Sequence, residues 1–494
     1  MQIISAVSKS KKIYQWAAFI ALGLGVAVRI AAYLQNRNLM IDESNVARNI
    51  YERGFAALVS PLSYEQYAPP VWLWEIKLNT LFFGFSEYAL RLLPLLSGVL
   101  SLLLMYLVLK ALDLYRAIWY SLALMCVGYM FIRYSGELKQ YSTDILVALA
   151  LILLALRTNL QKDSLLRFCM LWLIAGSIAI WGSMPSVFIL AGVGGYYFMH
   201  LLQTRDYKKI LPLSIVAILW VVQFGLYYML ILKAQANSEY LQNYHKDYFL
   251  SATPTTFKEW DHNLSLMGQV LGEAGGFTLL AKAMHTLFIV YACIHLLMKN
   301  RPLFALLVVP FLLLLVAAAA NQYTMIPRVV LFIMPVMLIL VGYTMNIMMA
   351  TRQVYQRALL IMACSVCLVN VSALRFLIVP METEQLTDAL QFVQDKGITD
   401  GKHLYIHNGA QPAFIYYTTI HPAKDKYKAI SNAALVPWDK DYHLVAEQVP
   451  SPCAFVFTSI DDEELRQRKV KLAEQINCID SMDEKGSHAY IYSR

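Results

Sequence analysis

Long apolar runs recur along most of this chain, and they restrict its fold more than any other feature. The stretch 303–320, for example, contains no charged residue. A helix of roughly 20 apolar residues crosses a bilayer core of about 30 Å. Of the 494 residues, 58% are hydrophobic and only 15% are charged, whereas a soluble protein has about 25% charged residues. We therefore expect a polytopic α-helical membrane protein with one water-facing tail domain.

Eleven membrane spans are expected from the positions of the apolar runs. Short loops rich in Lys and Arg follow every second span, and together with the basic N-terminus they fall on one side. The positive-inside rule makes that side cytoplasmic, so the tail lies on the opposite, extracytoplasmic side. The expected spans are 14–34, 92–111, 117–133, 142–157, 168–182, 184–202, 211–233, 280–298, 303–320, 329–349 and 358–379.

The first apolar run is interpreted as a membrane anchor, although a cleavable signal peptide is the competing interpretation. Arg29 interrupts the run, and no cleavage site with small residues is clear. The net charge of +8 lies largely in the loops that set orientation, so no nucleic-acid partner is expected. Cys453 and Cys478 lie in the tail, and the sequence leaves open whether they form a disulfide.

The chain divides into a transmembrane region, 1–380, and a soluble α/β domain, 381–494. Two extracytoplasmic segments of the first region are too polar to span. Segment 35–91 is expected to hold interfacial helices, one of them at 43–53 and one after Pro69-Pro70, and segment 234–280 is interpreted as a lid-like loop. In the tail we expect helices at 384–396, 412–418 and 461–476, and strands at 403–407, 453–458, 477–482 and 488–492.

Polar residues gather in three clusters at helix ends on the extracytoplasmic side. Ionisable groups at membrane depth need a partner or a water-filled cavity, so convergent carboxylates and cations suggest a site for a charged lipid head group. The candidates are Asp42 and Glu43 after the first span; Arg133, Glu137, Lys139 and Tyr141 between the third and fourth; and Tyr323 and Arg328 between the ninth and tenth.

Each candidate also has a purely structural explanation. Asp42 fits the N-cap of the helix that follows it, and Glu43 is favourable near the positive end of that helix dipole. Glu137 is explained equally well as the ion-pair partner of a neighbouring cation. The cations themselves are explained as interfacial anchors whose side chains reach the lipid head groups. No metal-ligand spacing and no Gly-rich phosphate loop stand out, so no metal is expected to be obligatory, although a divalent ion remains compatible.

Several short motifs, in this order along the chain, are shared with one family. The sequence resembles the protein O-mannosyltransferase-like membrane glycosyltransferases, a group that includes the lipid A aminoarabinose transferases. The resemblance covers nearly the whole chain, but the family often has His before the double proline, where this chain has Ala68. The motifs are Ile41-Asp42-Glu43-Ser44, Pro69-Pro70, Arg91-Leu92-Leu93-Pro94, the stretch 137–142 beginning Glu-Leu-Lys, the stretch 327–331 beginning Pro-Arg, and the stretch 405–414.

The resemblance implies a GT-C fold and an inverting transfer of sugar from a polyprenyl-phosphate carrier to the hydroxyl of a glycolipid, glycan or protein, on the outer face of a bacterial cytoplasmic membrane. It also implies that Asp42 is the catalytic carboxylate, with Glu43 beside it. We expect burial to raise the pKa of Asp42 and improve it as a base. Lys139, Arg328 and, third, Arg133 are expected to stabilise the departing phosphate, with support from Glu137, Tyr141 and Tyr323.

A non-catalytic scaffold whose tail binds a partner is one alternative, and two other functions remain beside it. One is a polysaccharide polymerase or ligase, although those enzymes depend on outer loops rich in Arg and His rather than on an acidic pair after the first span. The other is a non-enzymatic flippase or transporter of lipid-linked sugars. Transporters usually contain inverted repeats and broken helices at the membrane midplane, and this sequence shows no repeat.

Overall fold

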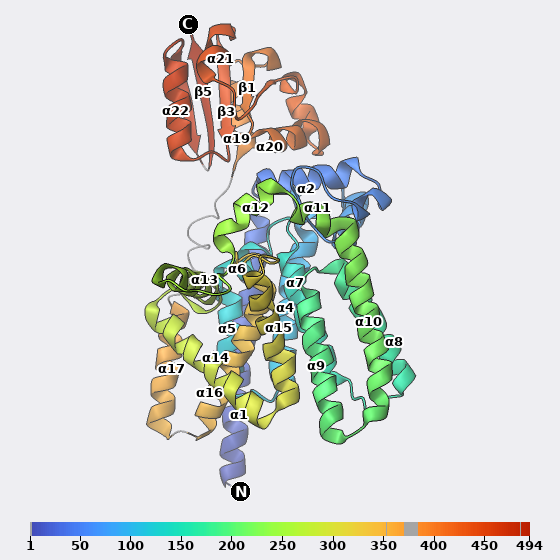
Figure 1. Ribbon diagram of the computed structural model, residues 1–494. Helices are drawn as coiled ribbons and strands as arrows, with labels where there is room; N and C mark the ends of the chain where they lie inside the picture. Colours follow the sequence, from blue (N-terminus) through green and yellow to red (C-terminus); the bar gives the residue numbers. More distant parts are fainter. Residues whose placement is uncertain (1, 352, 370–383, 485) are drawn as a thin grey trace.

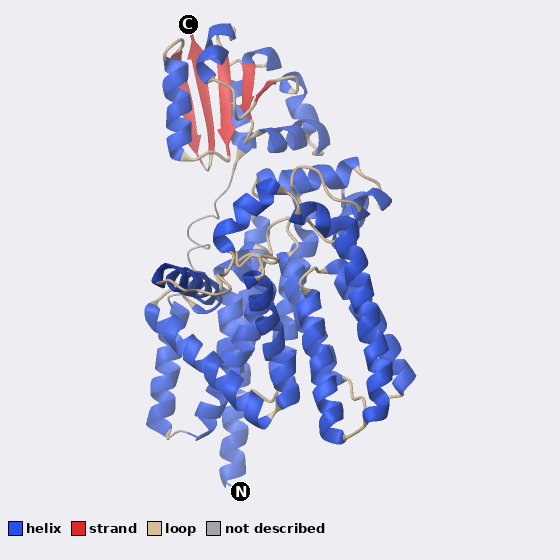
Figure 2. Cartoon of the chain, viewed as in Figure 1, coloured by secondary structure: helices blue, strands red, loops and turns tan. Residues whose placement is uncertain are grey.

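The computed structural model describes residues 2–351, 353–369, 384–484 and 486–494. Long helices form one end of the molecule and a small sheet flanked by helices forms the other (Figures 1 and 2). The N-terminus lies at the far end of the long helices from the sheet. This arrangement separates an apolar, helical part from a compact α/β part.

Among the described residues, eight helices are long and apolar enough to cross a membrane, and they coincide with eight of the expected spans. The protein is a multi-pass membrane protein. The eight helices are α1 (Gln2–Leu34), α4 (Glu87–Ala111), α8 (Leu165–Gly182), α9 (Ser186–Thr204), α10 (Ile210–Tyr227), α14 (Leu279–Lys299), α15 (Arg301–Ala319) and α16 (Met334–Thr351). The π-helix η3 (Tyr228–Leu232) and α11 (Lys233–Ala236) continue the fifth of them, α10, and the 3-10 turns η2 (Tyr207–Lys209) and η5 (Leu331–Ile333) precede α10 and α16.

The three other expected spans correspond to shorter helices. The expected span 117–133 is not one helix, because Gly128 takes an extended backbone (φ −65°, ψ 131°) and separates α5 (Ile118–Val127) from α6 (Tyr129–Arg133). Span 142–157 matches α7 (Tyr141–Arg157). Span 358–379 begins within α17 (Val354–Val369), and its end lies outside the described residues, as does the expected domain boundary at 380.

Small residues allow the long helices to approach one another closely. At Gly192 of α9, an added Cβ would lie 2.6 Å from Cγ of Pro310 in α15, the close contact that small residues permit between membrane helices. Arg29, the charge inside the first span, is buried and donates to the carbonyl oxygens of Gly25, Met125 and Cys126. Its Nη1 and Nη2 atoms therefore find partners within the helix bundle, whereas its buried Nε has none among the described residues.

The two polar segments form short helices at the end of the bundle that faces the sheet (Figure 1). The expected helix 43–53 is confirmed as α2, and the helix after the double proline as α3, which Pro70 opens, a position where its fixed φ suits the first turn. The bounds are α2 (Ile41–Glu52), η1 (Ala56–Val59), α3 (Pro70–Phe83), α12 (Glu239–His245), η4 (Lys246–Tyr248) and α13 (Phe257–Gly275).

The tail is a five-stranded sheet in the order β2-β1-β3-β5-β4. Strand β1 is parallel to β2 and β3, and β5 is antiparallel to β3 and β4. The expected tail helices and strands are confirmed, whereas β2 and α21 were missed. The bounds are α19 (Leu386–Asp395), η6 (Gly401–His403), β1 (Leu404–His407), α20 (Gln411–Ile415), π-helix η7 (Tyr416–Ile420), η8 (Lys424–Ile430), β2 (Ala434–Val436), α21 (Tyr442–Gln448), β3 (Cys453–Thr458), α22 (Asp462–Ala473), β4 (Asn477–Glu484) and β5 (Ser487–Ser493). Cys453 and Cys478 are both free.

The tail packs directly on α2. One apolar core contains Val46 and Ile50 of α2 together with Leu390, Phe414 and Tyr417 of the tail, and all five are buried. Burial of apolar surface is the main favourable contribution to such packing. Helix α2 therefore lies between the helix bundle and the sheet.

Candidate active site

Asp42 lies in the first turn of α2, and its carboxylate meets two polar side chains. Its Oδ2 lies 3.2 Å from Nζ of Lys139, and its Oδ1 accepts a hydrogen bond of 3.2 Å from Nε2 of Gln66. Lys139 Nζ also donates to Gln66 Oε1 at 3.1 Å, which closes a triangle. The Asp42 side chain is 44% exposed, so a ligand can reach it.

The N-cap explanation for Asp42 is wrong. The residue at the N-cap position is Met40, and its N–H donates to Oε2 of Glu43 at 3.2 Å. A cap needs a side chain that accepts from the backbone of the next turn, whereas the Asp42 carboxylate faces Lys139 and Gln66. Asp42 is therefore available for a role other than capping the start of α2.

The expected rise in the pKa of Asp42 is also wrong. The neighbouring Lys139 charge lowers the pKa of the Asp42 carboxyl, burial acts in the opposite direction, and Arg328 lowers it further. An opposite charge at ion-pair distance favours the ionised form. For Lys139, burial would lower the pKa, but Asp42 outweighs it and the pKa is raised. Both groups are therefore charged at neutral pH.

Arg328 brings a second cation to the same site. Its charge acts on both Asp42 and Lys139, and its Nη2 donates to the hydroxyl of Tyr244 in α12 at 2.9 Å. Within the described ranges Arg328 forms no ion pair, and its buried Nε has no hydrogen-bond partner. No ion pair among the described residues balances the charge of Arg328.

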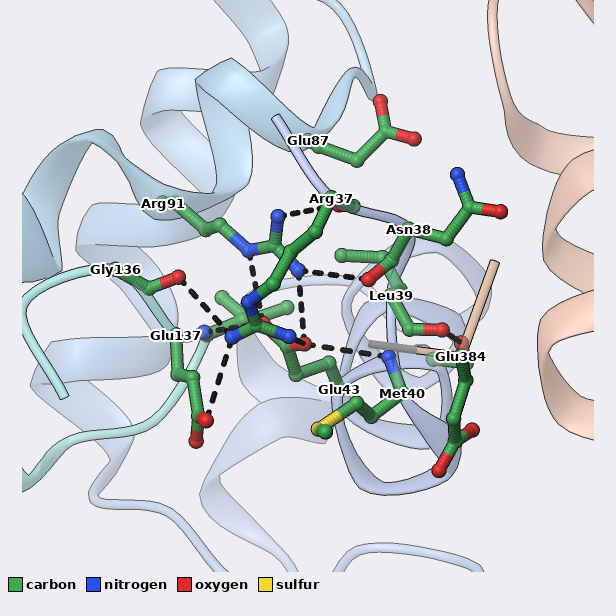
Figure 3. A network of polar contacts seen from close by, with 12 residues as sticks. Arg37, Asn38, Leu39, Met40, Glu43, Glu87, Arg91, Gly136, Glu137 and Glu384 are labelled. Atoms are coloured by element: carbon green, nitrogen blue, oxygen red, sulfur yellow. Dashed lines mark hydrogen bonds and ion pairs between the residues drawn. The ribbon is translucent and has the colours of Figure 1, made fainter. Parts of the chain in front are cut away.

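Glu43 is adjacent to Asp42 in sequence but occupies a different environment (Figure 3). Its side chain is 1% exposed and forms ion pairs of 3.1 Å with Arg37 and 2.8 Å with Arg91. It also accepts from the backbone N–H of Leu138 at 2.7 Å. Burial would raise the pKa of Glu43, but Arg37 and Arg91 outweigh it and the pKa is lowered. The geometry is that of an anchor between loops rather than of a group that meets substrate.

Arg133 and Glu137 belong to the Glu43 cluster rather than to the Asp42 triangle. Arg133 Nε lies 2.7 Å from Oε1 of Glu137, and its Nη1 donates to Tyr129 at 2.8 Å. The same Glu137 oxygen lies 3.3 Å from Arg37 Nη2. The structure therefore does not bring Arg133 to Asp42, and its charge is balanced by Glu137.

The two tyrosines flank the site. Tyr141 opens α7 two residues after Lys139, and its ring packs edge-on against Tyr134 at 4.8 Å. Tyr323 donates to the carbonyl oxygen of Val329 at 3.1 Å. This hydrogen bond ties together the loop that carries Arg328. Tyr323 thus holds backbone next to Arg328, and Tyr141 packs on Tyr134 close in sequence to Lys139.

Gln66 is a site residue that the sequence did not reveal, since a single Gln before the double proline has no distinguishing pattern. Its backbone carbonyl accepts from Gln235 Nε2 at 2.9 Å, and Ser238 donates to Glu65 Oε2 at 2.9 Å. Segment 234–248 therefore crosses the site from Gln66 to Arg328, which Tyr244 contacts. The cover that this segment forms is consistent with the expected position of a lid, while its movement remains a prediction.

No protein-family model matches this sequence, and no curated protein matches it. Solved structures do match. The structure of ArnT, the lipid A aminoarabinose transferase, from Cupriavidus metallidurans bound to undecaprenyl phosphate has a TM-score of 0.55 at 15% identity, over 96% of this chain and 97% of ArnT. The apo form of ArnT has a TM-score of 0.52 at 15% identity, over 99% of this chain and 98% of ArnT.

A second match is the oligosaccharyltransferase of Archaeoglobus fulgidus tethered to an acceptor peptide, with a TM-score of 0.53 at 13% identity, over 97% of this chain and 74% of that one. Both proteins are membrane glycosyltransferases of the GT-C type. The chain therefore has the GT-C fold, with a small C-terminal sheet domain. Over nearly its whole length it is similar to ArnT in fold.

Proposed function

We propose that this protein is an inverting membrane glycosyltransferase that moves a sugar from a polyprenyl-phosphate carrier to a hydroxyl group of an acceptor. The observation that supports this function most directly is the ion pair of one half-exposed carboxylate, Asp42, with Lys139, while the charge of Arg328 acts on both. The GT-C fold supports it as well, since the similar ArnT was solved bound to undecaprenyl phosphate.

In the proposed reaction Asp42 acts as the general base. It takes the proton of the acceptor hydroxyl, whose oxygen attacks the anomeric carbon of the donor sugar. The new carbon–oxygen bond forms as the bond to the carrier phosphate breaks, and attack from the opposite face inverts the configuration. Proton removal by a positioned group typically contributes 10²–10⁴-fold to such a step.

Lys139 and Arg328 are proposed to hold the carrier phosphate. Negative charge collects on that phosphate as it leaves, and fixed cations stabilise it most in the transition state. Arg328 has no ion-pair partner among the described residues, and Lys139 lies between Asp42 and Gln66. Glu43 and Arg133 are not assigned to the reaction, because each already lies in an ion pair of its own.

The ion pair between Lys139 and Asp42 gives the free enzyme a weak base. Lys139 lowers the pKa of Asp42, so Asp42 accepts a proton less readily while the two remain paired. A donor phosphate competes for Lys139, and as it draws the ammonium away, the pKa of Asp42 rises. We propose that donor binding in this way activates the base only when the sugar is present.

No divalent metal is assigned to the reaction. The only carboxylate in the Asp42 triangle is Asp42 itself, and Lys139 already compensates its charge. Divalent cations such as Mg²⁺ prefer one or more free carboxylates together with substrate phosphates. Turnover by purified protein that has been treated with EDTA is therefore expected to match untreated protein, and a loss that Mg²⁺ or Mn²⁺ restores would overturn this assignment.

We propose that the protein resides in a bacterial cytoplasmic membrane with its N-terminus in the cytoplasm and its C-terminal domain outside. The basic short loops support this orientation through the positive-inside rule. Cysteines introduced at exposed tail positions such as Glu463 should react with a membrane-impermeant maleimide in intact spheroplasts. Labelling only after lysis would reverse the orientation.

The function is tested with purified protein, a panel of undecaprenyl-phosphate sugars and an envelope lipid extract from a deletion strain. Released undecaprenyl phosphate is measured by mass spectrometry. Asp42→Asn should lower release by at least ~10²-fold, while Glu52→Gln, on the exposed side of α2, should not. Wild-type release by Asp42→Asn would remove Asp42 from the role of base, and transbilayer movement of donor without release would favour a flippase.

A further inference from the structure

The segment that leads into Asp42 is bonded to the C-terminal domain through its backbone. The N–H of Asn38 donates to Gln385 Oε1 at 3.1 Å, and the N–H of Ile41 donates to Glu384 Oε2 at 3.3 Å. The N–H of Leu39 donates to the hydroxyl of Tyr417 at 3.0 Å. Figure 3 shows Glu384 beside this segment. Three of the four backbone N–H groups at 38–41 therefore donate to residues more than 300 positions away in the chain.

One of these contacts satisfies the start of α2. The first four N–H groups of a helix have no partner within the helix, and Ile41 is the first residue of α2. The carboxylate of Glu384 accepts from its N–H. Burial raises the pKa of Glu384 to about 7, so it is the accepting oxygen rather than a full negative charge that caps the helix. The tail thus supplies a capping group to the helix that carries Asp42.

A second polar contact joins the tail to the Glu43 cluster. Glu87 opens α4, and its two carboxylate oxygens bind the hydroxyl of Tyr417 at 2.7 Å and Nε2 of His421 at 3.1 Å. One turn further along α4, Arg91 binds Glu43 and donates to the carbonyl oxygens of Arg37 and Asn38. The residues that flank Asp42 are therefore held from both the tail and the bundle.

The side chain of Asn38 contributes a contact in the opposite direction. Its Oδ1 accepts from the N–H of Thr387 at 2.8 Å and from its hydroxyl at 2.9 Å. Thr387 lies at the start of α19 and Glu384 and Gln385 directly precede it, so segment 38–41 and segment 384–387 each satisfy backbone donors of the other. Such reciprocal bonding, next to the shared apolar core, indicates a fixed junction.

We propose that the C-terminal domain is a positioning element of the active site, and that Glu384 and Tyr417 hold the backbone at residues 38–41 so that Asp42 meets Lys139 and Gln66. This proposal rests on the proposed function only for the identity of Asp42 as the base. The positioning residues act through the backbone and do not touch substrate. Small displacements of a reacting group lower turnover strongly, so the tail would affect the rate without binding either substrate.

The test uses full-length protein in nanodiscs and two independent readouts. Hydrogen exchange of a peptide that covers 38–44 reports the junction, and the undecaprenyl-phosphate release assay gives kcat and KM. Glu384→Ala and Tyr417→Phe should each speed exchange of that peptide and lower kcat by about tenfold, corresponding to a loss of about 1.4 kcal/mol. Affinity for undecaprenyl phosphate, which Lys139 and Arg328 hold, should stay within about twofold.

Two variants distinguish positioning from a general loss of folding. Glu384→Gln keeps an oxygen that can accept from Ile41 and should restore most of the kcat, which a lost domain fold would not permit. Asn38→Ala removes the contact from the bundle side and should reproduce the faster exchange. Glu463→Ala is the matched control, because Glu463 lies on α22 and its ion pair is with Arg466. It should change neither readout.

The proposal is overturned if exchange of 38–44 is unchanged in Glu384→Ala, Tyr417→Phe and Asn38→Ala, or if Glu384→Gln is as slow as Glu384→Ala. Failure of the proposed function gives a different result. In that case Asp42→Asn retains wild-type release, while the exchange measurements still report whether the tail holds the segment.

Discussion

Glu43 provides the sharpest test of how the site is built, because its geometry opposes the catalytic role that its position suggests. The carboxylate is 1% exposed and lies within 3.1 Å of two guanidinium groups, from Arg37 and Arg91. It also accepts from the N–H groups of Met40 and Leu138. Replacing it with Ala leaves two buried cations and two backbone donors without this partner.

The magnitude follows from that arrangement. Removing one member of a buried ion pair costs about 3–5 kcal/mol, because the remaining charge stays desolvated. Arg48 and Glu52 form an ion pair at 3.6 Å on the same helix, but Glu52 is 46% exposed. Pairs of that kind contribute about 0–1 kcal/mol. Glu43→Ala should therefore destabilise the protein several times more than Glu52→Ala.

The assay is equilibrium unfolding in mixed detergent and SDS micelles, followed by tryptophan fluorescence. A double-mutant cycle of Glu43→Gln with Arg91→Gln should show coupling, because the second substitution removes a charge that the first has left unpaired. Equal stability of Glu43→Ala and Glu52→Ala would refute this reasoning. So would a Glu43→Gln variant that unfolds like wild type but has lost undecaprenyl-phosphate release, since that result would return Glu43 to the reaction.

Three further predictions follow from the site and the bundle. Lys139→Met removes the charge that lowers the pKa of Asp42. Because the ionised base is active above its pKa and is lost as the pH falls through it, the acidic limb of kcat/KM against pH should move to higher pH, and an unmoved limb would contradict the pairing. Gln66→Leu removes the two hydrogen bonds through which the amide joins Asp42 to Lys139. It should lower kcat by about tenfold with little change in undecaprenyl-phosphate affinity. A kcat equal to that of the wild type would show that the amide is dispensable. Gly192→Val places a side chain against Pro310 and should cost about 1–3 kcal/mol in the same unfolding assay, whereas Gly194→Val, which meets nothing within 4 Å, should be close to neutral.

Local pattern was enough to predict the parts of the fold that depend on local physics. A span is recognised from the length and apolarity of one run, and eight of the expected spans were found on helices of sufficient length. The same holds for α2 and for β3, whose bounds match the expected strand 453–458. The break at Gly128 was missed, because a chain bend inside an apolar run leaves hydropathy unchanged.

The site was predicted only in part, and the division has a physical basis. Charge type, and the side of the membrane inferred from loop charge, suggested that Asp42, Lys139 and Arg328 would meet. The structure pairs Asp42 with Lys139, and the charge of Arg328 acts on both. Neighbouring positions on a helix point about 100° apart, so Asp42 and Glu43 face different surroundings although they are adjacent. Which of the two is buried against Arg91 depends on how α2 packs, and sequence order carries no information about that.

Contacts between distant segments came from tertiary packing alone. Gln66 reaches Asp42 across 24 positions, and Glu384 reaches Ile41 across 343. Neither residue type is unusual, and nothing in its neighbours marks it. The spans follow from the free energy of transferring each run into lipid, a sum over its own residues. The partner of a buried polar group follows from whichever donor or acceptor packing brings within about 3 Å, and that is a property of the folded chain.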